Sequence, residues 1–435
     1  MRGVVAIVGR PNVGKSSLFN RIVGERLSIT DDASGITRDR IYGKASWLNQ
    51  EFRVIDTGGI ILKDEPFSKE IRAQAELAID EADVIIFVVD ARASILDEDR
   101  DVARILHKGN KKVIVAANKV DDVSFLSDIY EFYALGCGDV IPVSSLHGVG
   151  IGDLLDKVIE LLPAEKKDPY SEGTIKFCLI GQPNVGKSTL SNAIIGKNRT
   201  IVSEIPGTTR DAIDTMFTYH DKKFVVIDTA GIRKQGKIYE NAEKYSVLRA
   251  MSAIERSDIA VLVLDGTFEL SEQDKRIAGF AREANRAMII VVNKWDIVTK
   301  DDKTMKKMTD KIKTQMPFLD FAPVIFLSAI KNERVHMLID KIIEVYENFS
   351  RHVPTSLLND VIQDALILNQ PPIFNGNRLR VNYVTQEDVC PPSFVLFVND
   401  ESHMHFSYLR YLDNTLRNSF EFEGSPLKFT LRKNE

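Results

Sequence analysis

Cysteine is scarce in this chain of 435 residues, which contains Cys137, Cys178 and Cys390 and no others. Three widely spaced thiols argue against a disulfide framework and a zinc cluster, and they favour small buried side chains in a reducing compartment. Long apolar runs are also missing, because none approaches the roughly 20 residues that cross a bilayer. The first run, 4–8, is too short for the core of a signal peptide. We therefore expect a cytoplasmic protein without a membrane partner.

A strong excess of either charge is absent as well. The net charge of −5 gives no general attraction to nucleic acid or membranes, so any such binding surface must be local. What is present is a globular composition, with 44% hydrophobic and 27% charged residues. At typical domain sizes, the length predicts about three domains.

A long internal repeat organises the sequence. The segment GRPNVGKS, which ends at Ser16, recurs as GQPNVGKS, which ends at Ser188, 172 positions later (188 − 16). Further motifs recur at the same or nearly the same interval. A unit of this length is a duplicated domain and not a solenoid repeat.

Short apolar runs alternate with amphipathic stretches in each copy, a pattern typical of strands separated by helices. The first copy is expected to have strands 4–8, 84–90 and 113–117 and helices 16–23, 66–82 and 126–135. The second is expected to have strands 175–180, 224–228, 259–265 and 287–292 and helices 188–195, 239–256 and 301–315. The alternation predicts the α/β class, with two tandem domains that each hold a mostly parallel sheet covered by helices.

Changes in composition predict the domain boundaries. Residues 1–162 form the first domain, the polar segment 163–174 is a linker, and 175–350 form the second domain. Residues 351–435 form a small α/β domain without a phosphate loop. Its expected helices are 355–368 and 406–417, and its expected strands are 380–385, 394–398 and 428–431.

The repeated glycine-rich segments predict phosphate loops. A glycine-rich turn between a strand and a helix aims backbone N–H groups at phosphates, and the helix adds the positive end of its dipole. A lysine there reaches the β- and γ-phosphates, and the following hydroxyl binds Mg²⁺. The predicted nucleotide contacts are Gly9, Asn12, Val13, Gly14, Lys15, Ser16 and Ser17 in the first copy and Gly181, Asn184, Val185, Gly186, Lys187, Ser188 and Thr189 in the second.

The segments NKVD (118–121) and NKWD (293–296) predict guanine recognition. The carboxylates of Asp121 and Asp296 can accept two hydrogen bonds from the N1–H and N2–H₂ edge of guanine, which adenine lacks. A buried carboxylate that faced adenine would lose its partners, so the sequence favours GTP over ATP. The predicted base-binding residues are Asn118, Lys119, Asp121, Ser144 and Ser145 in the first copy and Asn293, Lys294, Asp296, Ser328 and Ala329 in the second.

Two further motifs in each copy predict switch segments and hydrolysis. The motifs DTGG and DTAG supply an aspartate for the outer coordination of Mg²⁺ and a glycine N–H for the γ-phosphate, and a threonine upstream can join the metal. The residues predicted to act in hydrolysis are Lys15, Thr37, Asp56, Gly59, Lys187, Thr209, Asp228 and Gly231. The predicted Mg²⁺ residues are Ser16, Thr37, Asp56, Ser188, Thr209 and Asp228.

These motifs, duplicated and followed by a small α/β domain, resemble the Era-type GTPases, and among them the bacterial double GTPases. The resemblance spans essentially the whole chain, and its most specific stretches are KYSVLRA (244–250) and PSFVLFVN (392–399). It implies a GTP/GDP switch for assembly of the large (50S) ribosomal subunit, which binds pre-ribosomal particles and ribosomal RNA in a nucleotide-dependent way. It also implies a monomer with a KH-like C-terminal domain that lacks the GxxG loop of true KH domains.

The resemblance also bears on the mechanism. Ile60 and Ile232 stand where Ras-like enzymes have the glutamine that positions water. In the family a K⁺ ion near the phosphates is thought to supply positive charge, and the phosphate-loop asparagines, here Asn12 and Asn184, help to hold it. An asparagine after proline also suits the turn by itself.

Some features of the sequence depart from this pattern or leave it open. The segment 330–334 (IKNER) lacks the glycines of its counterpart 146–150 (LHGVG), which puts the backbone beside the second guanine site in doubt. The C-terminal domain has 8 Lys/Arg and 10 Asp/Glu, so RNA binding there needs a clustered face. The candidates are Arg378, Arg380, Lys428, Arg432 and Lys433. We expect its aromatic residues to be core: Tyr383, Phe394, Phe397, Phe406 and Tyr408.

Two other functions stay open at this point. One is a GTPase of RNA modification or membrane traffic, although no added catalytic domain, lipidation motif or membrane helix supports it. The other is a pair of nucleotide-gated binding modules with incidental hydrolysis, which the isoleucines at the glutamine position favour.

Overall fold

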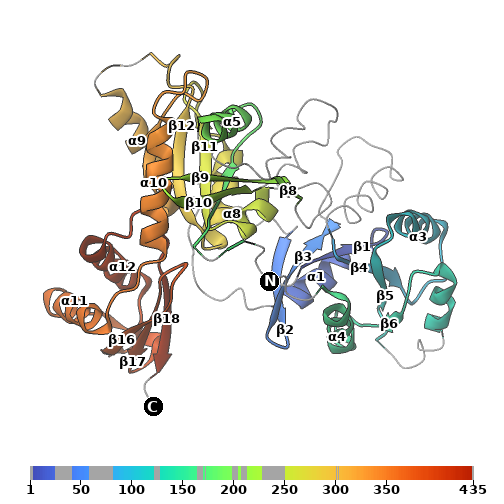
Figure 1. Ribbon diagram of the computed structural model, residues 1–435. Coiled ribbons are helices and arrows are strands. Elements are labelled where there is room, and N and C mark those ends of the chain that lie inside the picture. The colour runs from blue at the N-terminus through green and yellow to red at the C-terminus, as the bar shows by residue number, and fades with distance from the viewer. Residues whose placement is uncertain are drawn as a thin grey trace. The chain divides into compact units, whose positions relative to one another are not determined.

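A computed structural model describes residues 3–24, 42–57, 82–121, 128–163, 170–171, 173–197, 204–206, 213–227, 250–299, 301 and 303–433. The chain divides into two compact units, Met1–Pro169 and Tyr170–Glu435, which run from blue to teal and from green to red in Figure 1. The expected helix 66–82 and most of 239–256 lie outside the described residues. Among the described helices, none is both long and apolar enough to cross a bilayer.

The first unit contains a six-stranded sheet in the order β2-β3-β1-β4-β5-β6. All neighbouring strands are parallel except the edge pair of β2 and β3. The strands are β1 (Val4–Val8), β2 (Tyr42–Trp47), β3 (Gln50–Asp56), β4 (Val84–Asp90), β5 (Lys112–Asn118) and β6 (Val140–Pro142). The described helices are α1 (Lys15–Val23), α3 (Asp97–Gly109), η3 (Asp128–Leu135) and α4 (Ile151–Leu161). The predicted α/β class with a mostly parallel sheet is confirmed.

One expected α-helix of the first unit has a different geometry. Residues Asp128–Leu135 form a 3₁₀ helix. Its buried side chains, Ile129, Phe132 and Leu135, are spaced by three residues, and the exposed Tyr130 and Tyr133 stack at the same spacing. Three residues per turn align such a pattern on one face, which an α-helix would not do.

The second unit contains a seven-stranded sheet in the order β13-β12-β11-β7-β10-β9-β8. Its strands are β7 (Ile175–Ile180), β8 (Glu204–Pro206), β9 (Ile213–Tyr219), β10 (Lys222–Ile227), β11 (Ile259–Asp265), β12 (Ala287–Asn293) and β13 (Val324–Phe326). Its helices are α5 (Lys187–Lys197), α8 (Glu272–Glu283), α9 (Thr304–Gln315) and α10 (Val335–Phe349), with the 3₁₀ turn η4 (Pro317–Leu319). Strand β9 is antiparallel to both of its neighbours, β8 and β10, and all other neighbouring strands are parallel.

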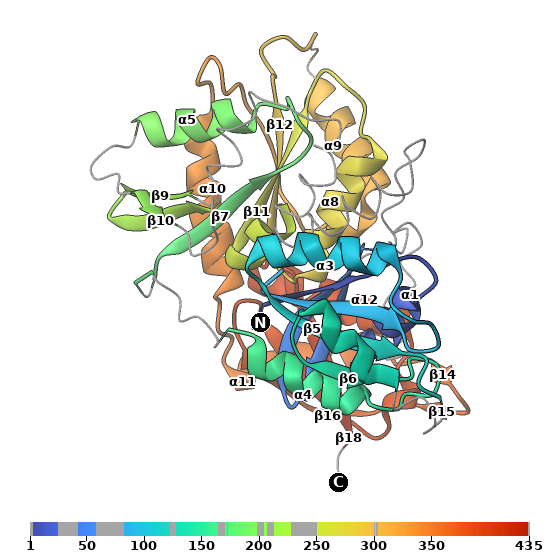
Figure 2. The same ribbon diagram turned by 90° about the vertical axis from the view of Figure 1, so that its right-hand side faces the viewer.

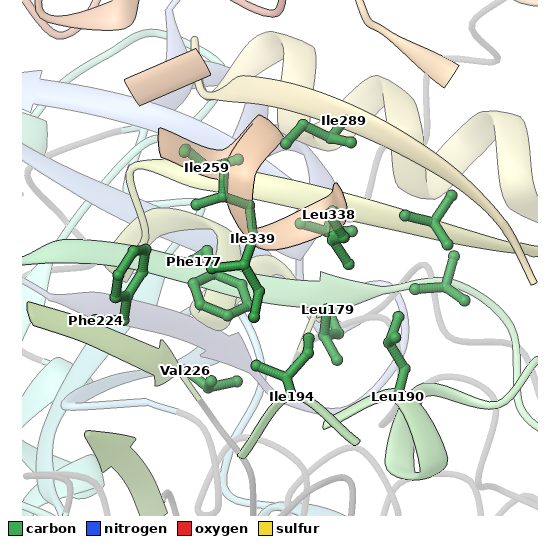
Figure 3. Close-up of a cluster of buried hydrophobic side chains, with 14 of the residues drawn as sticks. Phe177, Leu179, Leu190, Ile194, Phe224, Val226, Ile259, Ile289, Leu338 and Ile339 are labelled. Atoms are coloured by element: carbon green, nitrogen blue, oxygen red, sulfur yellow. The ribbon is translucent and has the colours of Figure 1, made fainter. Parts of the chain in front are cut away.

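Helices cover both faces of this sheet. Figure 2 shows α5 and α10 on one side of the strands and α8 and α9 on the other. Under α10, Leu338 and Ile339 meet Phe177 and Phe224 of the sheet in a fully buried cluster (Figure 3). A parallel strand with both faces buried has a continuous apolar sequence, which is why these strands were recognisable.

The C-terminal part of the second unit is a small α/β domain. Strands β16 (Val381–Asp388), β17 (Ser393–Val398) and β18 (Lys428–Lys433) form its sheet, and β17 pairs antiparallel with β16 and parallel with β18. Its other elements are helices α11 (Thr355–Leu368) and α12 (Phe406–Phe420), the pair β14 (Ile373–Phe374) and β15 (Asn377–Arg378), and the turn η5 (Glu401–His403).

The aromatic residues of this domain divide between core and surface. Phe394 and Tyr408 are buried, as expected. Phe406 is 77% exposed and Tyr383 is 45% exposed, so the expectation of a wholly buried set is wrong for these two. Phe406 is the first residue of α12, and Tyr383 lies on β16, an edge strand of the sheet. At both positions the protein surrounds the ring incompletely.

Candidate nucleotide-binding sites

Each phosphate loop joins the end of a buried strand to the start of a helix. In the first unit β1 ends at Val8 and α1 begins at Lys15, and in the second β7 ends at Ile180 and α5 begins at Lys187. Neither helix has an acidic residue in its first turn. The free N–H groups and the positive dipole end of each helix therefore suit a phosphate.

The last glycine of each loop is required by space. Gly14 has a φ of +95°, and a Cβ built on it would lie 2.3 Å from Nδ2 of Asn118. Gly186 repeats this arrangement, with a φ of +97° and 2.3 Å to Nδ2 of Asn293. A side chain at either position would separate the phosphate loop from the base-binding loop.

The lysine of each loop folds back over it. The ammonium of Lys15 donates to the carbonyl oxygens of Gly9 and Arg10 at 2.8 and 2.9 Å. That of Lys187 donates to the carbonyls of Gly181 and Gln182 at 2.8 and 2.6 Å. Burial lowers the pKa of Lys187 to about 8. An anion at the helix start offers the ammonium a stronger acceptor than a carbonyl oxygen.

The asparagines of the two NKxD segments tie three loops together. Asn118 is fully buried, donates to the carbonyl of Val13 at 2.8 Å and accepts from the backbone N–H of Ser145 at 3.0 Å. Asn293 makes the same two bonds, to the carbonyl of Val185 at 2.9 Å and from the N–H of Ala329 at 3.0 Å. Each asparagine therefore holds the phosphate loop against the loop that follows the last strand.

The aspartates that are predicted to read guanine, Asp121 and Asp296, lie in different charge environments. In the first unit, the Ser144 hydroxyl bonds to Asp121 and lowers the pKa of that carboxyl, and Arg92 pairs with the same side chain. In the second unit, the nearest ammonium in the described chain is that of Lys331, 3.9 Å from Asp296. The lowered pKa keeps Asp121 ionised at neutral pH, as two hydrogen bonds from guanine require.

Two aspartates that the sequence reading missed orient the neighbouring lysines. The Lys119 ammonium lies 2.5 Å from Oδ2 of Asp90, and the Lys294 ammonium lies 2.6 Å from Oδ2 of Asp265. Both lysines have a positive φ, +71° and +58°. Asp90 and Asp265 are the last residues of equivalent apolar strands, β4 and β11, and this shared position was the available signal.

Two further contacts, which the sequence did not predict, anchor each phosphate loop to a neighbouring helix. Nε of Arg10 lies 3.3 Å from Oδ2 of the buried Asp99, and Nε2 of Gln182 lies 3.0 Å from Oδ2 of Asp274. Each aspartate is the third residue of its helix and also accepts from the backbone N–H that precedes the helix. The loops are thus anchored alike, although the first anchor is an ion pair and the second is a neutral donor on a carboxylate.

The glycine-free segment after Ser328 keeps the backbone of its glycine-containing counterpart. Ser144 forms an isolated bridge with Val149, and Ser328 forms the same bridge with Glu333. Asn332 and Arg334 adopt φ values of +56° and +60°, where the first unit has Gly148 and Gly150 at +77° and +71°. The loop geometry is therefore retained, and two non-glycine residues carry left-handed strain.

The second unit gathers the predicted residues around a cavity of about 220 Å³. Its lining residues are Asn184, Gly186, Thr189, Asn293, Lys294, Asp296, Ser328 and Ile330. All but Ile330 were predicted from the sequence as nucleotide contacts. The cavity connects the end of the phosphate loop with the base-reading aspartate, as a nucleoside requires.

The other residues predicted to contact nucleotide or Mg²⁺ lie in the loops, on the first turns of helices and at a strand end, or outside the described part of the chain. Val13 and Val185 are buried under their loops, and Ser16 and Ser17 are exposed on the first turn of α1. Ser188 is half-buried on α5, and Asp56 is buried at the end of β3, where it pairs in register with Ile7 of β1. The predicted switch residues outside the described part of the chain are Thr37, Gly59, Thr209, Asp228 and Gly231.

Two phosphate loops, each linked by a buried asparagine to its own base-binding loop on a mostly parallel sheet, define a tandem P-loop GTPase. A model of the 50S ribosome-binding GTPase family matches residues 4–119 and again 176–294, and a model of the C-terminal KH-domain-like part of EngA bacterial GTPases matches 352–432. The chain is 56% identical over 430 residues to GTPase Der of Halalkalibacterium halodurans, across 99% of this chain and 98% of the relative. It belongs to the GTPase Der family and is a GTPase.

A second relative agrees with this assignment. GTPase Der of Staphylococcus carnosus is 57% identical over 430 residues, across 99% of both chains. The two relatives and the family models confirm the family resemblance inferred from the sequence motifs. Among solved structures, the FeoB G-domain of Methanococcus jannaschii is 26% identical and matches 37% of this chain and 96% of its own, with a TM-score of 0.28.

Proposed function

We propose that both sites bind GTP with Mg²⁺ and that hydrolysis in them switches the affinity of the protein for pre-ribosomal particles of the large (50S) subunit. The observation that carries the site assignment is the 220 Å³ cavity between the second phosphate loop and Asp296. The first unit has the same supporting bonds from Asn118 and the same lysine–aspartate pair. Residues 1–162, 175–350 and 351–435 are the three functional parts in this proposal.

The described residues would assist hydrolysis chiefly by binding the phosphates. A water molecule attacks the γ-phosphorus, the bond to the β–γ bridging oxygen breaks, and GDP and phosphate leave. Lys15 and Lys187 would turn from the loop carbonyls to the β- and γ-phosphates and offset the charge on the leaving GDP. The N–H groups at the starts of α1 and α5 would bind the same oxygens.

The donors around each site fit Mg²⁺. The metal prefers oxygen ligands and keeps several waters. The first unit offers the exposed Ser16 hydroxyl on the first turn of α1 and the buried carboxylate of Asp56 at the end of β3. Ser188 has the equivalent position on α5. Bound Mg²⁺ would neutralise charge on the phosphates, and these residues would hold its position.

A K⁺ ion beside the phosphates is part of the same proposal. Asn12 and Asn184 both have a φ of +66° and are exposed at the outer side of their loops. The left-handed conformation accounts for asparagine at the turn, and the exposed amide oxygen is available to a cation. Faster turnover in K⁺ than in Na⁺ at equal ionic strength is the expected result, and equal rates would remove K⁺ from the proposal.

Binding to ribosomal RNA rests on the family match and on a weak local feature. The basic candidates of the C-terminal domain are partly neutralised within it, since Arg432 pairs with Glu387 at 2.7 Å and Lys433 lies 3.9 Å from Asp400. An RNA phosphate must therefore compete with these carboxylates. Such contacts weaken steeply with salt.

Co-sedimentation with large ribosomal subunits tests the proposal. It should be measured at several salt concentrations with GDP and with a non-hydrolysable GTP analogue. Binding with the analogue alone, falling steeply with salt, is expected for a GTP-gated factor that contacts RNA. Absence of binding in every nucleotide state would overturn the ribosomal role and leave the GTPase assignment intact.

A further inference from the structure

A second and larger cavity adjoins the guanine cavity of the second unit. It has a volume of about 400 Å³ and lies between the phosphate loop, the end of β11, α8 and α9. Its apolar walls are formed by Leu264, Leu270, Val292, Met308 and Ile312. Volumes of this size and a mainly apolar lining are typical of small-molecule sites.

This cavity is separate from the nucleotide cavity but shares walls with it. Asn184 and Lys294 line both spaces. Asp296 and Ser328 line the guanine cavity but not the larger one. A molecule in the larger cavity would therefore contact the nucleotide-binding lysine without occupying the base position.

The three acidic side chains at the larger cavity differ in their ion pairs. Asp265 pairs with Lys294 at 2.6 Å, and Glu269 pairs with Lys311 at 2.5 Å. Asp274, which also lines the cavity, is 6% exposed and has no ion pair within the described part of the chain. Its Oδ2 accepts hydrogen bonds from Gln182 and Ser271, and its Oδ1, like Oδ1 of Asp99 in the first copy, is buried without a hydrogen-bond partner there.

The first copy shows which chemical group can pair with a carboxylate in this position. There the equivalent aspartate, Asp99, receives Nε of the Arg10 guanidinium at 3.3 Å, in the position where Gln182 meets Asp274. Glutamine is uncharged and shorter than arginine, so it donates a hydrogen bond but brings no positive charge to Asp274. Lys187 interacts electrostatically with Asp274, but its ammonium donates its hydrogen bonds to the carbonyls of Gly181 and Gln182.

We propose that the 400 Å³ cavity is a binding site for a small organic cation, whose amidine- or guanidine-type head compensates Asp274 and whose apolar body contacts Leu264, Val292, Met308 and Ile312. The head takes over the function that the Arg10 side chain performs in the first copy. A planar cationic group with several N–H donors suits this carboxylate because a charged donor forms a strong hydrogen bond with a carboxylate oxygen, as Arg10 does with Oδ2 of Asp99. The apolar walls select a body of hydrocarbon character over a hydrated inorganic ion.

Benzamidinium is a suitable probe, and neutral benzamide, which has the same ring, is its control. Binding of each to the full-length protein is measured by titration calorimetry. We expect saturable binding of one benzamidinium per chain, at least about ten-fold tighter than benzamide, because a hydrogen bond to a charged group contributes that much. Equal affinity of the two probes would overturn the cationic assignment, and no saturable binding below about 10 mM would overturn the site.

Two variants locate the probe. Gln182→Arg restores the arginine–aspartate pair of the first copy in a loop that already accommodates it there, and Met308→Trp fills the apolar end of the cavity. Each is expected to weaken benzamidinium binding by about ten-fold or more. Arg10→Gln, the matched change in the first copy, should leave that binding unchanged. Binding that survives both cavity variants would place the probe elsewhere and overturn the proposal.

Discussion

At the residue scale, the two base-reading aspartates differ in how strongly their surroundings hold them. Asp121 is bonded by the Ser144 hydroxyl and paired with Arg92, whereas Asp296 has Lys331 at 3.9 Å. A guanine base must replace part of the first set of interactions. Because Asp296 lines the 220 Å³ cavity, base specificity can be tested there.

The substitution Asp296→Asn should move the second site from guanine to xanthine nucleotides. The amide reverses the hydrogen-bond polarity at the base edge, so GTP affinity should fall by about 100-fold or more while xanthosine triphosphate affinity rises. Fluorescent-nucleotide titrations of the full chain measure both, and Asp121→Asn is the matched control for the first site. Unchanged GTP affinity at the second site would contradict the base-binding role of Asp296.

Lys187 should make nucleotide binding at the second site depend on pH. Burial lowers its pKa to about 8 in the free site, and phosphates favour the charged form. Below pH 8 the lysine is charged in both states, so affinity should be flat. Above pH 8 the free lysine loses a proton that binding must restore, so GDP affinity should fall by up to about ten-fold per pH unit.

The control for this prediction is Lys187→Arg, because arginine keeps its charge across the range. GDP titrations at pH 7, 8 and 9 with the two proteins separate the lysine from titration of the base itself. The same decline in both proteins would show that Lys187 does not titrate in the free site.

At the scale of elements, the loop after Ser328 shows how one backbone can be formed by different residues. Gly150 is required in the first copy, since a Cβ there would lie 2.1 Å from the carbonyl oxygen of Pro142. Arg334 has the matching left-handed conformation at a φ of +60°. A non-glycine residue in this region costs roughly 1–2 kcal/mol.

The substitution Arg334→Gly should therefore stabilise the second unit. The gain should be about 0.5–1 kcal/mol in the free energy of unfolding, because glycine removes the strain but adds freedom to the unfolded chain. Urea unfolding of the GDP-free protein measures this gain in free energy. Gly150→Ala is the converse change in the first unit and should destabilise by at least about 1–2 kcal/mol; an unstable Arg334→Gly protein would argue against strain in this loop.

The elements that the sequence predicted best are the buried parallel strands. The expected strands 84–90 and 259–265 match β4 and β11 at both ends, because two buried faces require continuous apolar residues. The edge strand β2 of the first sheet and β9, the strand next to the edge of the second, were not predicted. In β9 the buried positions include Asp214 and Thr215, so hydrophobic alternation is broken by polar residues that only tertiary partners explain.

At the scale of the whole molecule, the C-terminal domain and the second GTPase domain form one unit through specific backbone contacts. Gly424 accepts from the N–H of Met288 and donates to the carbonyl of Phe321, both at 2.8 Å. The Lys341 ammonium lies 3.1 Å from Oε2 of Glu423. Figure 1 shows α10 leading from the second sheet into this domain. The contacts fasten the small domain at the end of the sheet where β12 begins.

Gly424→Ala should loosen this attachment. Gly424 has a φ of +77°, and a Cβ there would lie 2.4 Å from Cγ2 of Val345 on α10. Hydrogen exchange of amides in α12 and β18 should accelerate, with a loss of about 2 kcal/mol in the free energy of local opening. Gly376→Ala is the matched control, because Gly376 has a φ of +82° and open space around it. Equal effects of the two substitutions would mean that strain alone, and not the contact with α10, is at work.

The sequence by itself determined the duplication, the α/β class and the identity of the nucleotide motifs. These features depend on local patterns: glycine spacing, continuous apolar strands and polar residues at strand ends, which neighbouring residues specify. The tertiary structure alone decided which side chains support those motifs. Asp90, Asp99, Asp265 and Asp274 act on residues far away in the sequence, and Gln182 stands beside Asp274 where the first copy has an arginine beside its aspartate. Such pairings depend on the folding of distant segments onto one sheet edge, and no local pattern encodes that distance.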